Sequence, residues 1–230
     1  MCRIVFDASS HVTDVPSLNE VLEMGLNLSS EIFAILPRLR LLSAATISDI
    51  TQAFLHLALD EKNRDLTRFF CYRITQDSEG HYRTTDENMT YRFTRLPFDL
   101  TLNSFLLSAA LREHADRHKG TPPTAAPLLD TTAFRDDFTA GAENDNVAIA
   151  IYSELTALMK LIHFPLAKWA SNSKQLKAMW RDEGQDTEVQ TDVLGVSWHT
   201  EADCFSFDPL AILRKLPEGP TSKRTIGING

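Results

Sequence analysis

Two adjacent carboxylates, Asp136 and Asp137, lie between apolar residues in the stretch Ala-Phe-Arg-Asp-Asp-Phe, residues 133–138. Like charges this close repel each other, and burying them without a partner raises a pKa or costs several kcal/mol. A bound cation explains most simply why both are kept, and hard divalent ions such as Mg²⁺ prefer oxygen ligands. A further carboxylate, Asp49, lies 87 residues upstream of Asp136 (136 − 49), so the fold must bring two distant segments together.

Such carboxylates are suited to phosphoryl transfer. A pair of divalent ions about 3.5–4 Å apart can hold the attacking and leaving oxygens of that reaction, and Asp49, Asp136 and Asp137 are the residues that would bind them. The first hypothesis is therefore a two-metal nucleotidyl transferase. A metal-dependent phosphohydrolase would use the same carboxylates, and Asp136 and Asp137 could also be ordinary turn residues.

Composition sets the broad class of the protein. The chain has 230 residues, 43% of them hydrophobic, and can bury a full core. No apolar run approaches the roughly 18–20 residues that cross a bilayer, and the first residues lack the apolar segment of a signal peptide. We therefore expect an intracellular, cytoplasmic protein with no membrane partner. The three cysteines, Cys2, Cys71 and Cys204, are scattered, which argues against a zinc site and against a disulfide framework.

The formal net charge of −8 is unfavourable for binding nucleic acid, because phosphate backbones are bound mainly through lysine and arginine. Basic residues nevertheless cluster in two places, at Arg92 and Arg95 and again within residues 112–119. These clusters could face nucleic acid, although clusters of this kind more often lie on ordinary solvated faces.

Apolar segments that alternate or are rich in β-branched residues predict a sheet. The segment 44–50 should be a buried strand that delivers Asp49 to its carboxyl-terminal end. The other predicted strands are a short one at 3–7, a hairpin of 68–74 with 89–96, a second hairpin of 128–134 with 138–140 that carries Asp136 and Asp137 at its tip, an edge strand at 164–169, and a last hairpin of 193–198 with 204–207.

Helical periodicity and capping residues predict the helices. A capping box at Ser17 and Glu20 starts a short helix or turn, and a helix that begins near residues 29–31 should kink at Pro37. The clearest amphipathic pattern covers about 144–161 and should lie against the back of the sheet. Two further helices are predicted at 105–117 and 173–181. The sequence therefore predicts an α+β fold.

Several short motifs follow one another along most of the chain. They are Arg-Ile-Val-Phe-Asp-Ala-Ser (3–9), Ser-Leu-Asn (17–19), residues 49–55, Tyr-Arg-Phe-Thr-Arg-Leu-Pro-Phe (91–98), residues 134–137, Lys-Trp (168–169) and Val-Leu-Gly-Val (193–196). In order and spacing these motifs resemble the reverse transcriptase of Bel-Pao LTR retrotransposons, over roughly residues 3–225.

The resemblance implies a fragment of a right-hand polymerase. Its mixed, mainly antiparallel sheet would be backed by helices. Residues 1–208 would be a partial reverse-transcriptase unit, with fingers at about 1–43 and 64–95 and a palm at about 44–63 and 96–208. Residues 209–230 would be a truncated connection. Both ends look truncated, and we expect the thumb, RNase H, protease and integrase regions of the polyprotein to be absent.

The resemblance also implies an activity. This is RNA-directed DNA polymerisation, in which two Mg²⁺ or Mn²⁺ ions assist nucleotide transfer from a dNTP to a primer 3′-hydroxyl on an RNA or DNA template. By this resemblance, Asp49 and Asp136 are the principal metal ligands, Asp137 is the third carboxylate, and the backbone carbonyl of Ile50 is a further ligand. An intact element would carry the enzyme in a virus-like particle.

The nucleotide site is likewise implied by the resemblance. Arg3 would pair with the triphosphate, a contact for which a planar guanidinium is suited. Phe54 would be the steric gate that collides with a ribose 2′-hydroxyl. Lys168 would donate a proton to the leaving pyrophosphate, and Asp99 lies in the loop that approaches the nucleotide.

This sequence departs from the family pattern at several positions. Arg135 replaces a small or β-branched residue before the paired carboxylates, and it could salt-bridge with them or point into the template-primer groove. Asp99 replaces a glycine and adds bulk and negative charge near a triphosphate. Ser104 stands where proline is common. These changes favour an alternative, a catalytically decayed remnant that retains at most nucleic-acid binding.

Overall fold

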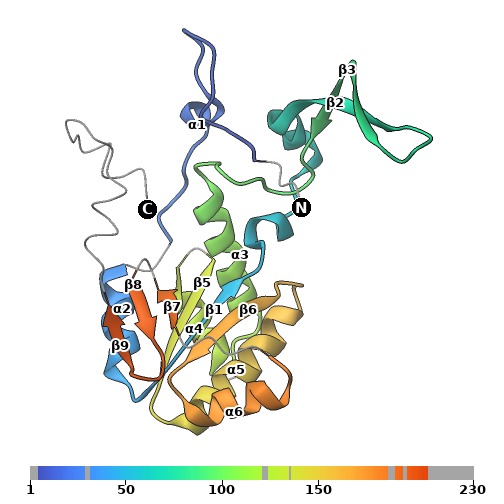
Figure 1. Cartoon of the computed structure of the whole chain (residues 1–230). Coiled ribbons are helices and arrows are strands. Elements are labelled where there is room, and N and C mark those ends of the chain that lie inside the picture. The colour runs from blue at the N-terminus through green and yellow to red at the C-terminus, as the bar shows by residue number, and fades with distance from the viewer. Residues whose placement is uncertain are drawn as a thin grey trace, which may run out of the picture.

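The computed structural model describes residues 5–28, 32–120, 124–134, 136–185, 190–193 and 196–206. Figure 1 shows a body of sheet and helices from which a long hairpin projects. Helices and antiparallel strands are mixed along the chain, so the predicted α+β class is confirmed. None of the helices in these ranges is both long and apolar enough to cross a membrane.

The body is built on a four-stranded sheet with the order β4-β5-β1-β6. Every strand pair in it is antiparallel. β1 (Ala44–Ile50) is central and largely buried, and β5 (Asp137–Ala142) and β6 (Leu166–Ser171) flank it. The short β4 (Ala133–Phe134) completes the sheet. The predicted buried strand at 44–50 is confirmed, as is the edge strand predicted at 164–169, which begins and ends two residues later than expected.

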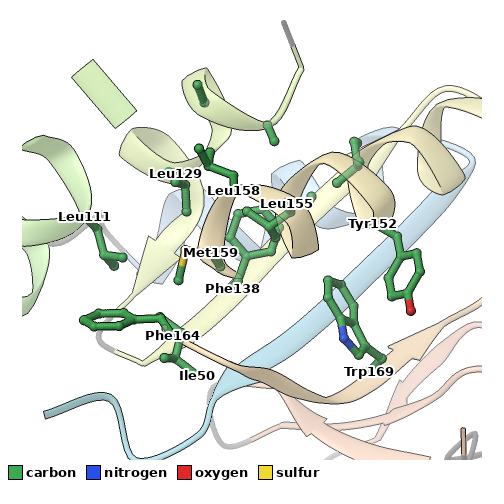
Figure 2. Packing of buried hydrophobic residues seen from close by; sticks show 14 of the residues in the cluster. Ile50, Leu111, Leu129, Phe138, Tyr152, Leu155, Leu158, Met159, Phe164 and Trp169 are labelled. Atoms are coloured by element: carbon green, nitrogen blue, oxygen red, sulfur yellow. The ribbon is translucent and has the colours of Figure 1, made fainter. Parts of the chain in front are cut away.

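One face of this sheet carries the main hydrophobic core. α5 (Asp145–Lys160) lies on it and buries one side of the helix, as the amphipathic pattern at 144–161 predicts. The Asn144 side chain accepts a hydrogen bond from the Val147 N–H and so caps the helix. Leu155 and Leu158 belong to the same buried cluster as Phe138 and Ile50 of the sheet, and all four are labelled in Figure 2.

Three more helices cover the same core. They are α3 (Asn103–Arg117), α4 (Ala125–Thr132) and α6 (Lys174–Asp182), and each contributes residues to the buried cluster. The helices predicted at 105–117 and 173–181 are therefore confirmed. The prediction of a strand at 128–134 is wrong for residues 128–132, which lie in α4. That helix is capped from a distance, because the Glu154 carboxylate of α5 accepts hydrogen bonds from the Thr124 and Ala125 N–H groups.

A second, three-stranded sheet lies on the opposite face of the central sheet. It consists of β7 (Gln190–Val193), β8 (Val196–His199) and β9 (Cys204–Ser206). Val193 and Trp198 pack with Ile47 of β1, and Leu39 of α2 (Ile32–Leu41) joins this cluster. The hairpin predicted at 193–198 with 204–207 is confirmed as β8–β9 for residues 196–198 and 204–206, whereas Val193 ends the strand β7 and residues 194, 195 and 207 lie outside the described residues. The strand β7 was not predicted as a separate element.

The projecting hairpin consists of β2 (Arg68–Gln76) and β3 (Tyr82–Arg92). The hairpin itself is confirmed, but its turn is much shorter than expected, because we predicted that the polar stretch 76–88 would form the loop between the two strands. The Asp77 side chain accepts hydrogen bonds from the Glu79 and His81 N–H groups, and Gly80 adopts a φ of 85°. These features close a tight turn and let the polar residues after it continue as a strand.

The remaining elements connect these units. α1 (Leu18–Val21) has the predicted capping box, in which Ser17 Oγ accepts from the Glu20 N–H and Glu20 accepts from the Ser17 N–H. Two 3₁₀ helices, η1 (Ala53–His56) and η2 (Glu61–Thr67), link β1 to β2. Residues 5–7 form no strand, and the rest of the strand predicted at 3–7 lies outside the described residues. Pro37 lies inside α2, and the predicted start of that helix at 29–31 is also outside the described part.

Candidate active site

Asp49 and Asp137 lie opposite each other on neighbouring antiparallel strands. They are register partners at the end of the β1–β5 ladder, next to the pair Ser48 and Phe138. Successive side chains of a strand point to opposite faces of a sheet. Because Phe138 points into the helical core, the two carboxylates point to the other face, which the β7–β9 sheet covers. The alternation of these strands therefore places both acids in one cleft.

The third predicted carboxylate belongs to the turn before β5. Asp136 lies between β4 and β5, and its backbone carbonyl accepts a hydrogen bond of 2.8 Å from the Ile50 N–H. This bond ties the turn to the end of β1, so the fold brings Asp136 and Ile50 together with Asp49. The side chain of Ile50 is buried in the core, and the role of its backbone carbonyl as a metal ligand stays a prediction.

Lys168 approaches the same acids from β6, on the other side of β1. Its Nζ lies 2.5 Å from Oδ2 of Asp49. The register between β1 and β6 shifts between Ile47 and Asp49, and Lys168 there has a φ of 53°. Bulges with a left-handed residue re-aim side chains beside functional sites. The bulge thus directs the lysine toward the carboxylates.

The acids stabilise the charged form of this lysine. The hydrogen bond to Asp49 is the main cause that raises the pKa of Lys168, and the charges of Asp49, Asp137 and Asp136 add to it. A raised pKa in the folded state means that the ion pair is present below the ordinary lysine pKa and is lost only as the pH rises through the raised value. Lys168 is therefore a cation throughout the neutral range. The contact adds little to stability, because 68% of the lysine side chain is exposed.

The cleft around these groups is small. It has a volume of about 90 Å³ and is lined by Asp49, Asp137 and Lys168, together with Thr191 and Asp192 of β7. Our sequence interpretation gave no role to these two β7 residues. They come from the segment just before the Val-Leu-Gly-Val motif, but only the packing of the second sheet shows that they face the carboxylates.

The carboxylate oxygens of the cleft can be compared with the ligands that a divalent ion usually has in proteins. Mg²⁺ is commonly held by one or two carboxylates and completed by waters and substrate phosphates. Asp49 and Asp137 supply two carboxylates of the required kind, and Asp49 would be open to an ion only after the Lys168 ammonium moves off it. Among the residues that the structure describes, no three His, Cys, Asp or Glu side chains are grouped to hold a metal ion. The predicted two-ion site stays a prediction.

Phe54 lies outside this cleft in the 3₁₀ helix η1 that follows β1. Its half-buried ring packs edge-to-face on Phe98, with ring centroids 5.3 Å apart and planes at 85°. It contacts the helical core and also the smaller cluster around Leu96 and Leu100. These contacts fix the position of the Phe54 ring, which follows Asp49 by five residues.

Asp99 also lies apart from the carboxylate cleft, and it ties the N-terminal segment to the loop after β3. Its Oδ2 accepts a hydrogen bond of 3.0 Å from the N–H of the buried Ala8, and its carbonyl accepts one of 2.7 Å from Asn19. Asn19 in turn accepts from the Thr101 N–H. Asp99 has a φ of 73°, the region that glycine adopts most readily. The aspartate thus occupies a glycine-like conformation and adds a bond that glycine lacks.

Replacing Asp99 should separate these two effects. Asp99→Ala removes the bond to the buried Ala8 N–H and keeps the strained backbone, so it should lower the free energy of unfolding by about 2 kcal/mol. Asp99→Gly loses the same bond but relieves the strain, so it should cost about 1 kcal/mol less. Urea denaturation measures both values. Asp14→Ala is a matched control, because Asp14 has a φ of 65° and makes no side-chain hydrogen bond within the described ranges. Equal losses for Asp99→Ala and Asp99→Gly would contradict the assignment.

Two residues of the sequence hypothesis lie outside the described residues. Arg3, the predicted triphosphate ligand, precedes residue 5, and Arg135 falls in the gap between 134 and 136. The predicted effect of Arg135 on the carboxylates stays a prediction.

Comparisons with known proteins support the fold. No family model and no curated protein matches the sequence. Among solved structures, the chain is similar to the foamy viral protease-reverse transcriptase dRH in complex with double-stranded DNA, with a TM-score of 0.56 and 12% sequence identity, over 91% of this chain and 30% of that one. It is also similar to the foamy viral protease-reverse transcriptase in complex with an RNA/DNA hybrid, with a TM-score of 0.54 and 12% identity, over 86% of this chain and 22% of that one. The chain thus has a reverse-transcriptase-like fold and spans less than a third of the length of these proteins.

Proposed function

We propose that the chain is the polymerase domain of a reverse transcriptase of the Bel-Pao type. It would add nucleotides from dNTPs to a primer 3′-hydroxyl on an RNA or DNA template. The observation that carries the proposal is the cross-strand pair Asp49 and Asp137, with Asp136 in the adjoining turn, in a fold similar to foamy viral reverse transcriptase. The order of the sequence motifs supports the Bel-Pao type.

The proposal includes a division of the chain into palm and fingers. The four-stranded sheet and its helices, which hold the three acids, would be the palm. The projecting hairpin β2–β3 and the N-terminal segment would belong to the fingers (Figure 1). The template-primer partner is supported by the solved neighbours, which were bound to double-stranded DNA and to an RNA/DNA hybrid.

The chemical roles follow from the cleft. Asp49, Asp136 and Asp137 would hold Mg²⁺ or Mn²⁺, which when bound lowers the pKa of the primer hydroxyl and stabilises the leaving pyrophosphate. The sheet holds the backbones of Asp49 and Asp137 in register, and the Lys168 ammonium would have to leave Asp49 before that carboxylate binds an ion. Arg3 and Phe54 would act at the triphosphate and the sugar of the incoming nucleotide, and Asp99 would shape the adjoining loop.

Lys168 has two states in this proposal. While it is bound to Asp49, its raised pKa makes it a weak acid, and it neutralises the carboxylate. Once it is released, the same ammonium can move to the pyrophosphate and supply a charge or a proton. The general-acid role therefore requires that the contact with Asp49 break first.

A second candidate function is nucleic-acid binding without catalysis. It is favoured by one observation, namely that a lysine ammonium already neutralises Asp49. The metal-dependent phosphohydrolase would use the same acids but would need no primer.

Primer extension distinguishes these functions. The chain is incubated with Mg²⁺, a labelled primer on an RNA or a DNA template, and single dNTPs. Polymerase activity predicts extension by the complementary nucleotide only, with release of pyrophosphate. A phosphohydrolase would instead release phosphate or shorten the strand without templated addition. Retention of the template-primer in a binding assay with no extension would identify the non-catalytic alternative and overturn the polymerase proposal for this chain.

A further inference from the structure

The hairpin β2–β3 exposes an apolar stripe on one face. Phe70, Tyr72 and Ile74 alternate along β2, and Tyr82 lies opposite Gln76 on β3. The β2–β3 register shifts between Tyr72 and Ile74 by an even number of residues, so all four side chains still share a face. Their exposed fractions are 79%, 57%, 59% and 76%, respectively. Large apolar side chains gathered in one exposed patch commonly mark an interaction surface. We refer to these four residues as the hairpin stripe.

Several side chains on the opposite face of the hairpin already have partners within the chain. At its base, Phe69 stacks on Tyr91 and packs against Phe93, which in turn contacts Phe6. Farther out, Arg73 pairs with Glu87 and Arg83 with Asp77. The hairpin is thus attached to the body through one face, and the stripe is not used by that attachment.

The edges of the hairpin are also uncovered. It forms a two-stranded sheet of its own, and neither outer edge pairs with another strand among the residues described. Figure 1 shows that it projects away from the main sheet. Two-stranded hairpins are only marginally stable in water without a further packing partner, and open edges readily pair with other chains. A partner that covers the stripe would therefore stabilise this element.

Charge favours a protein partner over a nucleic acid. Binding a phosphate backbone requires available cations, but each arginine of β2 and β3 is already paired with a carboxylate. Arg68 and Arg92 both contact Asp65, and Arg73 and Arg83 are paired on the opposite face. The stripe itself is formed by uncharged side chains, and the whole chain is acidic, with a net charge of −8.

We propose that the hairpin stripe is a self-association surface, on which two copies of this chain pack stripe against stripe about a two-fold axis. A two-fold contact uses the same patch on both copies and closes after two. Side chains of this size each bury on the order of 150 Å². The eight side chains of two stripes then bury at most roughly 1,200 Å², which is the lower end of specific interfaces. The inference does not depend on the proposed polymerase function.

The test is the oligomeric state of the full chain. Sedimentation velocity over concentrations up to roughly 100 µM should show a monomer–dimer equilibrium, since an interface of this size is expected to be weak. The double variant Phe70→Ser/Ile74→Ser should weaken association at least about tenfold. Leu26→Ser is a matched control, because Leu26 is 72% exposed but lies outside the hairpin. Circular dichroism checks that each variant keeps its secondary structure.

Three outcomes would overturn the proposal. The wild-type chain could stay monomeric over the whole concentration range, or the double variant could dimerise as strongly as the wild type. A third result, loss of single-stranded oligonucleotide binding in the double variant with self-association unchanged, would assign the stripe to nucleic acid instead. If the double variant unfolds, Tyr82→Ser alone should still weaken the dimer, because it removes one exposed ring near the hairpin turn and no buried contact.

Discussion

Asp49→Asn should reduce templated nucleotide incorporation by about a thousandfold or more. The substitution keeps the size of the side chain and removes the negative charge that would hold the metal ion. Metal ions supply several kcal/mol of transition-state stabilisation, and each 1.36 kcal/mol is a factor of ten in rate. Single-turnover primer extension with saturating dNTP measures the chemical step directly.

The fold should survive this substitution. Asp49 is partly exposed and its partner Lys168 is mostly exposed, so losing the pair should change the free energy of unfolding by less than about 1 kcal/mol. Asp116→Asn is the matched control, because Asp116 on α3 forms an exposed pair with Lys119, just after that helix, and is not among the residues that line the cleft. Full activity of the Asp49→Asn variant would exclude Asp49 from the site. Equal loss in both variants would point to a general effect of charge.

Lys168→Met should tighten the binding of Mn²⁺ to the chain by about 30-fold. The methionine keeps much of the length of the side chain and removes the cation that contacts Asp49 at 2.5 Å. Two unit charges about 4 Å apart interact with roughly 1 kcal/mol in bulk water and 4 kcal/mol near a protein surface. An intermediate value of about 2 kcal/mol gives the stated factor. Electron paramagnetic resonance of free Mn²⁺ measures the binding without any turnover.

The pH dependence of this effect has a definite sign. Because the pKa of Lys168 is raised above its ordinary value, the competing charge persists from neutral to mildly alkaline pH. The affinity ratio between Lys168→Met and wild type should therefore be the same at pH 7 and at about pH 9. Lys160→Met, which removes an exposed cation from the end of α5, should leave Mn²⁺ binding unchanged. Equal affinities for the wild type and Lys168→Met would show that the lysine does not compete for the site.

Local patterns were sufficient to predict the strand that carries Asp49 and several of the helices. The apolar residues that predict β1 and α5 recur within short, continuous segments, and the capping box of Ser17 and Glu20 spans only four positions. Such signals involve near neighbours and so can be interpreted without the fold. The two carboxylate segments were expected to meet, and the register of Asp49 with Asp137 brings them together.

The features that the sequence did not predict depend on distant residues. α4 is helical partly because Glu154, about thirty residues away, caps its first turn. The ion pair of Lys168 with Asp49 joins strands separated by 119 positions, and it depends on a bulge for which no local signal was recognised. Thr191 and Asp192 enter the cleft only because one sheet packs on another. Each of these features depends on contacts between residues far apart in the sequence, and the periodicity of one sequence does not predict such contacts.

The central position of β1 has a consequence for how the chain is made. Its register partners begin at Asp137, 88 residues after Asp49 (137 − 49), and its other neighbour, β6, comes later still. At a synthesis rate of about 5–20 residues per second, this apolar strand waits roughly 4–18 s before its first partner is synthesised. Meanwhile the hairpin β2–β3, whose contacts are local, can form. The most buried strand of the sheet is therefore synthesised early and paired late, so the nascent chain is exposed to misassociation until the acids meet.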